Sequence, residues 1–166
     1  MKRMKKYELT EETSEVAGLT LHRIRAVAAL NNISAGELGG FIEKEENLSQ
    51  YGNAWVYGNA KVYGDAKVYG DAKVYGDAEV CGNAEIRGDG HLITIGAIGS
   101  RNSYTTFFRD KSGGISVKCG CFCGNIDEFL EKVSDTHRDN HHAKTYRAAA
   151  ELARIHIGPE ESGGEL

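Results

Sequence analysis

The chain has 166 residues, a formal net charge of −4 and an isoelectric point of about 5.9. This charge excludes non-specific nucleic-acid binding, which requires a basic surface. No apolar run has the length of a membrane span, and the basic opening MKRMKKYELTEE is not followed by the apolar segment of a signal peptide. We therefore expect a soluble, cytoplasmic protein with no membrane partner, built as one compact unit or two small ones.

Residues 1–40 are predicted to form an N-terminal β cap. Residues 7–9 read as a short strand, and the apolar positions of LTLHRIRAVAAL (residues 19–30) favour a second strand, although half of that stretch also fits a helix. Ala17 and Gly18 supply the turn between the two strands. A stack of strands has unpaired backbone groups at its end, and this segment would cover them.

Residues 41–92 are predicted to form a region of six-residue repeats. From residue 53 to residue 90 the sequence reads NAWVYG, NAKVYG, DAKVYG, DAKVYG, DAEVCG, NAEIRG and DG, which has a period of six. A helix would need a period of about 3.6 and a flat strand a period of about two, so the repeat indicates short strands joined by corners. The aliphatic positions that would point inward are Val56, Val62, Val68, Val74, Val80 and Ile86.

Three repeats would close one coil of about eighteen residues, with about 4.8 Å between successive coils. Side chains eighteen residues apart would then lie on one another. The predicted pairs are Lys61 with Glu79, Lys67 with Glu85, and Tyr57 with Tyr75.

The repeated tyrosines are a candidate surface for subunit contact or for ligand stacking. The alternative is that they belong to a plain solvated face of the repeat. The four residues are Tyr57, Tyr63, Tyr69 and Tyr75.

The repeat places an aliphatic residue four positions before a small one, as in Val56 and Ala60, and in this it resembles the hexapeptide-repeat left-handed parallel β-helix. The longer stretch from IRAV through GELGGFIE to NLSQYGNAWVYGNA looks like a family of bacterial and phage hexapeptide-repeat proteins, some labelled acetyltransferase-like on their repeats alone. The resemblance implies a left-handed parallel β-helix. Together with the number of repeats and the segments on either side of them, it leads us to predict a mainly β protein with a short left-handed parallel β-helix of about three coils, an N-terminal β cap and a C-terminal α+β module. It also implies a homotrimer or another homo-oligomer.

Residues 93–157 are predicted to form the C-terminal α+β module, a β-hairpin followed by two helices. SYTTFFRD and GISVKCGCF read as strands joined by a turn. Asn125 is a suitable N-cap for a helix over residues 126–133, and a second helix is expected from about residue 143 to residue 156. Residues 158–166 are predicted to be a disordered tail.

The C-terminal module contains a predicted anion site around the turn IGSRNSYTT. Arginine offers a two-pronged donor for phosphate or carboxylate, and hydroxyl groups can complete the site. The alternative is a solvated turn. The predicted ligand-binding residues are Ser100, Arg101, Thr105, Thr106, Arg109 and Lys118.

A second candidate in this module is a metal site. Cys119, Cys121 and Cys123 alternate, so on one strand they would point to the same side, and His137 follows within reach. The alternative is small buried apolar side chains with surface histidines, in which case no cofactor is bound. Without a signal peptide, the four cysteines are expected to be free thiols or metal ligands rather than disulfides.

These features predict a non-catalytic, oligomeric binding protein. By analogy with short repeat proteins of phages, it would sequester a small anionic, nucleotide-like ligand or block a host defence protein. The alternative is an acyltransferase that uses acyl-CoA, as the resemblance implies. No histidine lies between His22 and His91, however, and the repeat region is short for an acyl-CoA groove. We therefore predict no catalytic residue.

Overall fold

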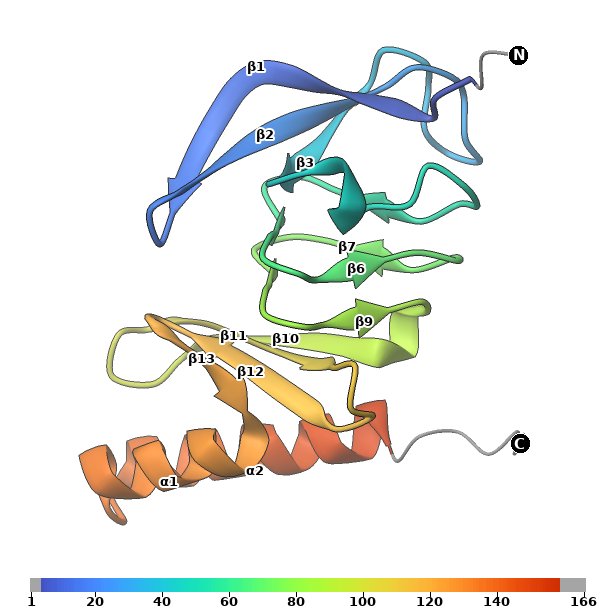
Figure 1. Cartoon of the computed structure of the whole chain (residues 1–166). Coiled ribbons are helices and arrows are strands. Elements are labelled where there is room, and N and C mark those ends of the chain that lie inside the picture. Colours follow the sequence, from blue (N-terminus) through green and yellow to red (C-terminus); the bar gives the residue numbers. More distant parts are fainter. Residues whose placement is uncertain (1–3, 159–166) are drawn as a thin grey trace. The chain divides into compact units, whose positions relative to one another are not determined.

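The protein is described here by a computed structural model that defines residues 4–158 (Figure 1). The chain divides into two compact units, residues 1–89 and residues 90–166. The predicted disordered tail lies outside the described residues, except for Gly158. Between residues 4 and 158, no helix has the length and apolar character needed to cross a membrane.

The N-terminal unit begins with the predicted hairpin. Strands β1 (Tyr7–Val16) and β2 (Leu19–Ala26) pair antiparallel, and β2 pairs antiparallel with β3 (Leu38–Ile42). The turn at Ala17 and Gly18 is confirmed, because both residues have the positive φ angles that a tight hairpin turn requires. Strand β1 is much longer than the three residues predicted for it.

The repeat region forms six strands of two residues each. They are β4 (Trp55–Val56), β5 (Lys61–Val62), β6 (Lys67–Val68), β7 (Lys73–Val74), β8 (Glu79–Val80) and β9 (Glu85–Ile86). A 3₁₀ turn, η1 (Glu45–Asn47), precedes them, and another, η2 (Asp89–His91), follows. The six aliphatic positions of the repeat are buried, as predicted.

Repeats eighteen residues apart pair in parallel, β4 with β7, β5 with β8 and β6 with β9. Lys61 therefore lies opposite Glu79 and Lys67 opposite Glu85, and the rings of Tyr57 and Tyr75 stack with centroids 5.0 Å apart. The predicted eighteen-residue pairing is confirmed.

The predicted fold class, a mainly β protein built on a left-handed parallel β-helix, is wrong. Residues 4–158 are mixed, with 41% strand and 23% helix, and their strands are mostly antiparallel. A turn interrupts the chain at each repeat, so each repeat strand has only two residues. The pairs β4–β7 and β6–β9 form separate two-stranded sheets, whereas β5 and β8 extend the sheet of β1, β2 and β3 through the parallel pair of β3 and β5. Residues 4–158 form no closed or solenoid sheet. The long strands lie outside the repeats, where hairpin turns impose antiparallel pairing.

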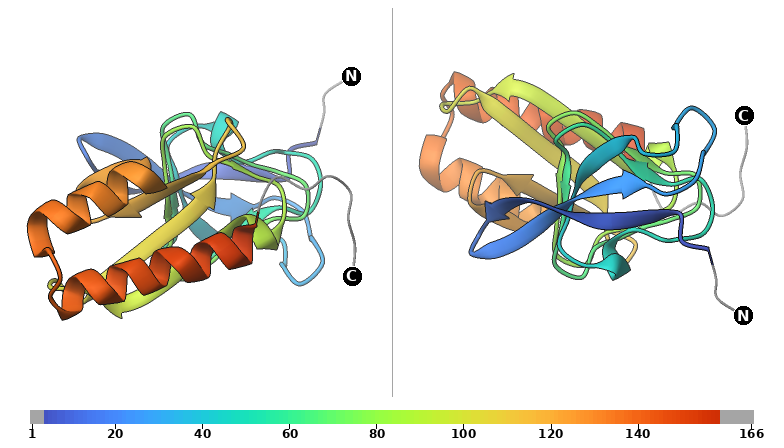
Figure 2. Two further views of the ribbon diagram at one scale, coloured as in Figure 1. Left: turned by 90° about the horizontal axis from the view of Figure 1, so that it is seen from below. Right: turned by 90° about the horizontal axis from the view of Figure 1, so that it is seen from above.

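The C-terminal unit is a four-stranded antiparallel sheet with two helices on one face. The strands are β10 (Leu92–Ile98), β11 (Ser103–Arg109), β12 (Ile115–Cys119) and β13 (Phe122–Asn125), paired in that order. The helices α1 (Ile126–His137) and α2 (His141–Ile157) lie side by side against the sheet (Figure 2). The predicted hairpin and both helices are confirmed, and Asn125 caps α1 by accepting a hydrogen bond from the Glu128 N–H.

Asp110 organises the turn between β11 and β12. Its carboxylate accepts hydrogen bonds from the Ser112 N–H at 2.9 Å, the Gly114 N–H at 3.2 Å and the Ser116 hydroxyl at 2.7 Å. Burial by itself would raise the pKa of Asp110, but the hydrogen bonds from Ser112, Ser116 and Gly114 outweigh it, and the net pKa is below the usual value.

We expect Asp110→Asn to lower the free energy of unfolding at neutral pH. We also expect the free energy of unfolding of this variant to fall less than that of the wild type when the pH is lowered. A carboxyl whose pKa is lower in the folded state stabilises fully above its unfolded pKa of 3.8, and this contribution is lost as the pH falls through the lower folded pKa. Urea unfolding at pH 7, 4 and 2.5 should show a loss of about 1–3 kcal/mol at pH 7 for the variant and a smaller acid-induced loss than in the wild type. Asp139→Asn, at a carboxylate that is 91% exposed, is the control. If the wild type and Asp110→Asn lost the same free energy of unfolding between pH 7 and pH 2.5, Asp110 would not have this role.

Candidate anion-binding site

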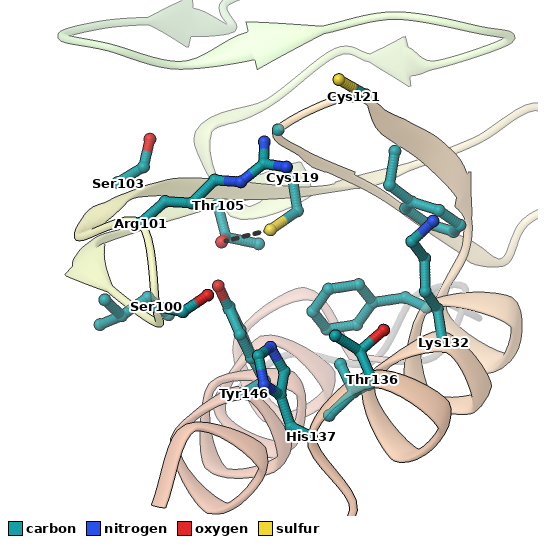
Figure 3. A pocket seen from close by; sticks show the side chains of 15 residues that line it. Ser100, Arg101, Ser103, Thr105, Cys119, Cys121, Lys132, Thr136, His137 and Tyr146 are labelled. Atoms are coloured by element: carbon teal, nitrogen blue, oxygen red, sulfur yellow. Dashed lines mark hydrogen bonds between the residues drawn. The ribbon is translucent and has the colours of Figure 1, made fainter.

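The C-terminal unit contains a cavity of about 190 Å³ between its sheet and its helices (Figure 3). Its lining comes from the turn after β10, from β11, from the turn between β12 and β13, and from both helices. Phe122 and Phe129 form an apolar wall, and the other side chains are mostly polar or basic. None of the fifteen lining residues is acidic.

Three of the six predicted ligand-binding residues line this cavity, namely Ser100, Arg101 and Thr105. Thr106 and Lys118 are paired across β11 and β12 on the opposite face of the sheet, because neighbouring residues of a strand point to opposite sides. There the Thr106 hydroxyl lies 3.2 Å from the Thr94 hydroxyl, and the Lys118 ammonium donates to the Gly120 carbonyl. The predicted group of six is therefore divided between two faces.

Arg109, the sixth predicted residue, is on the same face as Thr105 but four residues further along β11, or about 13 Å away. Its guanidinium donates to the carbonyls of Ile157 at 2.8 Å, Gly158 at 3.1 Å and Gly113 at 3.2 Å. It does not line the cavity. These contacts hold the C-terminal end of α2 against the turn that follows β11.

Arg101 extends over the turn between β12 and β13, and its side chain points towards Cys119 in Figure 3. Gly120 permits this approach, because a Cβ atom at that position would lie 2.7 Å from Nη1 of Arg101. Gly120 also has a φ of 58°, in the region that favours glycine. Within residues 4–158, Arg101 forms no ion pair with a carboxylate.

Helix α1 supplies cavity residues that the sequence analysis did not assign to an anion site. Phe129, Lys132, Val133, Thr136 and His137 line the cavity and follow the spacing of one helical face. This spacing could have identified these residues from the sequence, because it places the basic Lys132 and the hydroxyl of Thr136 on the same helix face as the apolar side chains. The Lys132 ammonium lies 6.0 Å from the centre of the Phe122 ring.

Tyr146 of α2 directs its hydroxyl into the cavity, close to Ser100 in Figure 3. The hydroxyl leaves no room for a Cβ atom at Gly99. Burial raises the pKa of Tyr146, Cys119 raises it further through charge and a hydrogen bond, and Arg101 partly opposes the shift. The phenol is therefore protonated at neutral pH and can donate a hydrogen bond to a ligand.

The predicted metal site does not form. The chain turns at Gly120 and Cys121, so Cys119 pairs with Phe122 on the helix side of the sheet while Cys123 pairs with Lys118 on the other side. Among residues 4–158, no group of three histidine, cysteine or acidic side chains is placed to hold a metal ion. The Cys119 thiol instead accepts a hydrogen bond of 3.4 Å from the Thr105 hydroxyl. Cys119 and Cys121 are free thiols, which agrees for these two residues with the expectation of free thiols or metal ligands rather than disulfides.

His137, the fourth predicted metal ligand, belongs to a cluster at the junction of α1 and α2. Its ring stacks on Tyr146 and lies 5.4 Å from the ring of His142, which in turn is 3.9 Å from His141. Desolvation is the largest cause that lowers the pKa of His142, and the nearby His141 and His137 lower it further. His142 is therefore neutral at pH 7 and adds no fixed charge beside the cavity.

The four tyrosines predicted as one stacking face do not share a side of the repeat region. They follow strands that belong to three different parallel pairs, so only Tyr57 and Tyr75 overlap. Tyr63 is buried, and burial, with Glu79 nearby, raises the pKa of its hydroxyl well above the usual value.

No protein-family model matches the chain, and no curated protein is significantly similar to it. The chemistry of the cavity can be stated from its own residues. A guanidinium, an ammonium and several hydroxyl groups converge there beside two phenylalanine rings. This combination can hold the negative head of a small organic molecule and cover its apolar part.

Proposed function

We propose that the protein is a non-catalytic binding protein for a small organic anion, held in the cavity of the C-terminal unit. The observation that carries the proposal is the placement of Arg101 and Lys132 on either side of a cavity without acidic lining (Figure 3). Both residues are exposed, and within residues 4–158 neither forms an ion pair with a carboxylate, so an anionic ligand would supply their counter-charge.

The lining indicates the form of the ligand. Arg101 can donate two parallel hydrogen bonds to a phosphate or carboxylate, and the hydroxyls of Ser100 and Tyr146 can complete its coordination. Phe122 and Phe129 would cover an apolar body. A volume of about 190 Å³ is below the roughly 300–1,000 Å³ of pockets for drug-sized ligands. The proposed ligand is therefore a phosphate or carboxylate group attached to about one ring, which is smaller than the nucleotide-like ligand expected from the sequence.

We expect Arg101→Gln and Lys132→Gln each to weaken binding of phenyl phosphate at least about tenfold, because a hydrogen bond to a charged group contributes about 1.5–3 kcal/mol. Isothermal titration calorimetry measures the affinity. Lys144→Gln removes the same charge from an exposed position of α2 outside the cavity and should leave the affinity unchanged. Phenol, which has the ring without the anion, should bind far more weakly than phenyl phosphate.

Two results would overturn this proposal. Wild-type affinity in both cavity variants would show that the anion binds elsewhere, and equal affinity for phenol would show an apolar site. Phosphorus NMR of the bound probe tests the absence of catalysis. Release of inorganic phosphate during incubation would contradict a purely binding role.

A further inference from the structure

The N-terminal unit has a second cavity, of about 390 Å³, with a different chemistry. It lies between the loop of residues 30–33 and the repeat region, and five of its seven lining residues are polar. Three of those five are asparagines, from two separate parts of the chain, namely Asn31, Asn32 and Asn53. Amide groups therefore make up most of the polar residues that line this cavity.

The loop presents two of these amides. Leu30 and Ile33 form an isolated antiparallel bridge, and the Leu30 N–H donates to the Ile33 carbonyl at 2.9 Å. Asn31 has a φ of 34°, a conformation that asparagine tolerates better than most residues. Both Asn31 and Asn32 are exposed at the tip, and neither side chain makes a hydrogen bond with any residue between 4 and 158. Their donors and acceptors are available to a ligand.

The repeat region supplies the opposite wall. Nδ2 of Asn53 donates to Asp71 at 3.3 Å, which leaves the amide oxygen of Asn53 as an acceptor. The Tyr57 ring is held by stacking on Tyr75, with an interplanar angle of 28°. Burial is the main cause that raises the pKa of Tyr57, so its hydroxyl is neutral and can both donate and accept.

Charge separates this cavity from the anion-binding one. Its single lining cation, Lys73, has Asp89 as a counter-charge, with Nζ 4.0 Å from Oδ2 and the Lys73 N–H donating to Oδ1 at 3.0 Å. None of its seven lining residues, all between residues 4 and 158, is acidic. With the ammonium already balanced, neither an anion nor a cation gains a new ion pair there, so a neutral polar ligand fits best.

We propose that this cavity binds a neutral saccharide. Sugar hydroxyls both donate and accept hydrogen bonds, and amide groups match them because each amide offers an oxygen and an NH₂ group. The C–H face of a sugar ring can lie on the Tyr57 ring, which Tyr75 supports from behind. The volume of about 390 Å³ is at the lower end of the roughly 300–1,000 Å³ range of ligand pockets and suits one or two sugar rings.

Saturation-transfer NMR tests the proposal with four probes: methyl α-glucopyranoside, methyl α-mannopyranoside, methyl β-galactopyranoside and N-acetylglucosamine. Each is used at about 10 mM, so that a site with a Kd of about 1 mM is mostly occupied. We expect transfer to the ring C–H protons of at least one probe. Asn32→Ala and Tyr57→Leu should each reduce the transfer at least fivefold. Asn83→Ala, at an exposed asparagine of the repeat outside the cavity, should leave it unchanged.

Asn32 lies at an exposed loop tip, so we expect Asn32→Ala to leave the fold intact. A loss of transfer in this variant would then come from the lost contact with the sugar. The absence of transfer to all four probes would overturn the proposal. So would transfer that is equal in wild type and both cavity variants. Stronger transfer to adenine than to any sugar would replace the saccharide with a flat base stacked on Tyr57.

Discussion

We expect Val68→Asp to unfold the N-terminal unit. Val68 is 1% exposed in β6, where it pairs with Ile86 of β9 and bridges to Leu48. A carboxylate at this position would be surrounded by aliphatic side chains without a partner. An uncompensated buried charge costs about 3–5 kcal/mol, which is comparable with the whole stability of a small domain. Circular dichroism during heating, with two-dimensional amide NMR to identify the unit that unfolds, measures the effect.

Lys67→Asp is the matched control, because it places the same side chain one residue earlier, on the exposed side of β6. Its expected cost is a few tenths of a kcal/mol, since the new carboxylate would lie opposite Glu85. An unchanged melting temperature for Val68→Asp would show that the aliphatic positions of the repeat do not form its interior. If Lys67→Asp were as damaging as Val68→Asp, burial would not be the cause of the loss.

The repeat region shows what a short sequence period can and cannot predict. The spacing of six was sufficient to predict that Val68 points inward, and three such repeats to a coil predicted that Lys67 lies opposite Glu85. The same period contains no information about the chain on either side of it. The fold class was wrong because the long strands, such as β1 and β11, form hairpins there and pair antiparallel. The length of each repeat strand, two residues, follows from the turn that recurs in each six-residue unit.

The candidate anion site was half predicted, for two physical reasons. Thr105 and Thr106 are neighbours on a strand and cannot share a face, so their separation was contained in the sequence. Lys132 was missed although the spacing of its helix face could have identified it, and Tyr146 was missed because it is far from Arg101 in the sequence and lines the same cavity only in the folded unit. The proposed metal site failed at Gly120, where a turn replaces the continuous strand on which the three cysteines would have been aligned.

We expect Arg109→Met to destabilise the C-terminal unit by about 3 kcal/mol and to leave anion binding unchanged. Arg109 is 8% exposed, and two of its hydrogen bonds go to the carbonyls of Ile157 and Gly158, at the end of α2. These carbonyls have no partner within the helix, and the negative end of the helix dipole favours a cation beside them. Each hydrogen bond to a charged group contributes about 1.5–3 kcal/mol, and methionine keeps most of the apolar stem without the donors. Urea unfolding measures the loss, and hydrogen exchange should show faster exchange at the Gly158 N–H, which bonds to the Arg154 carbonyl at 2.9 Å.

Two further variants separate this role from a general effect of charge. Arg154→Met removes a cation from the same turn of α2, but its pair with Asp127 is largely exposed, so we expect a loss below about 1 kcal/mol. Arg109→Lys keeps the charge and loses the two-pronged geometry, so its stability should lie between those of Arg109→Met and the wild type. If Arg109→Met had unchanged stability but bound phenyl phosphate more weakly, Arg109 would be a ligand-binding residue, as predicted from the sequence. In that case the hydrogen bonds to the end of α2 would not contribute to the stability of the unit.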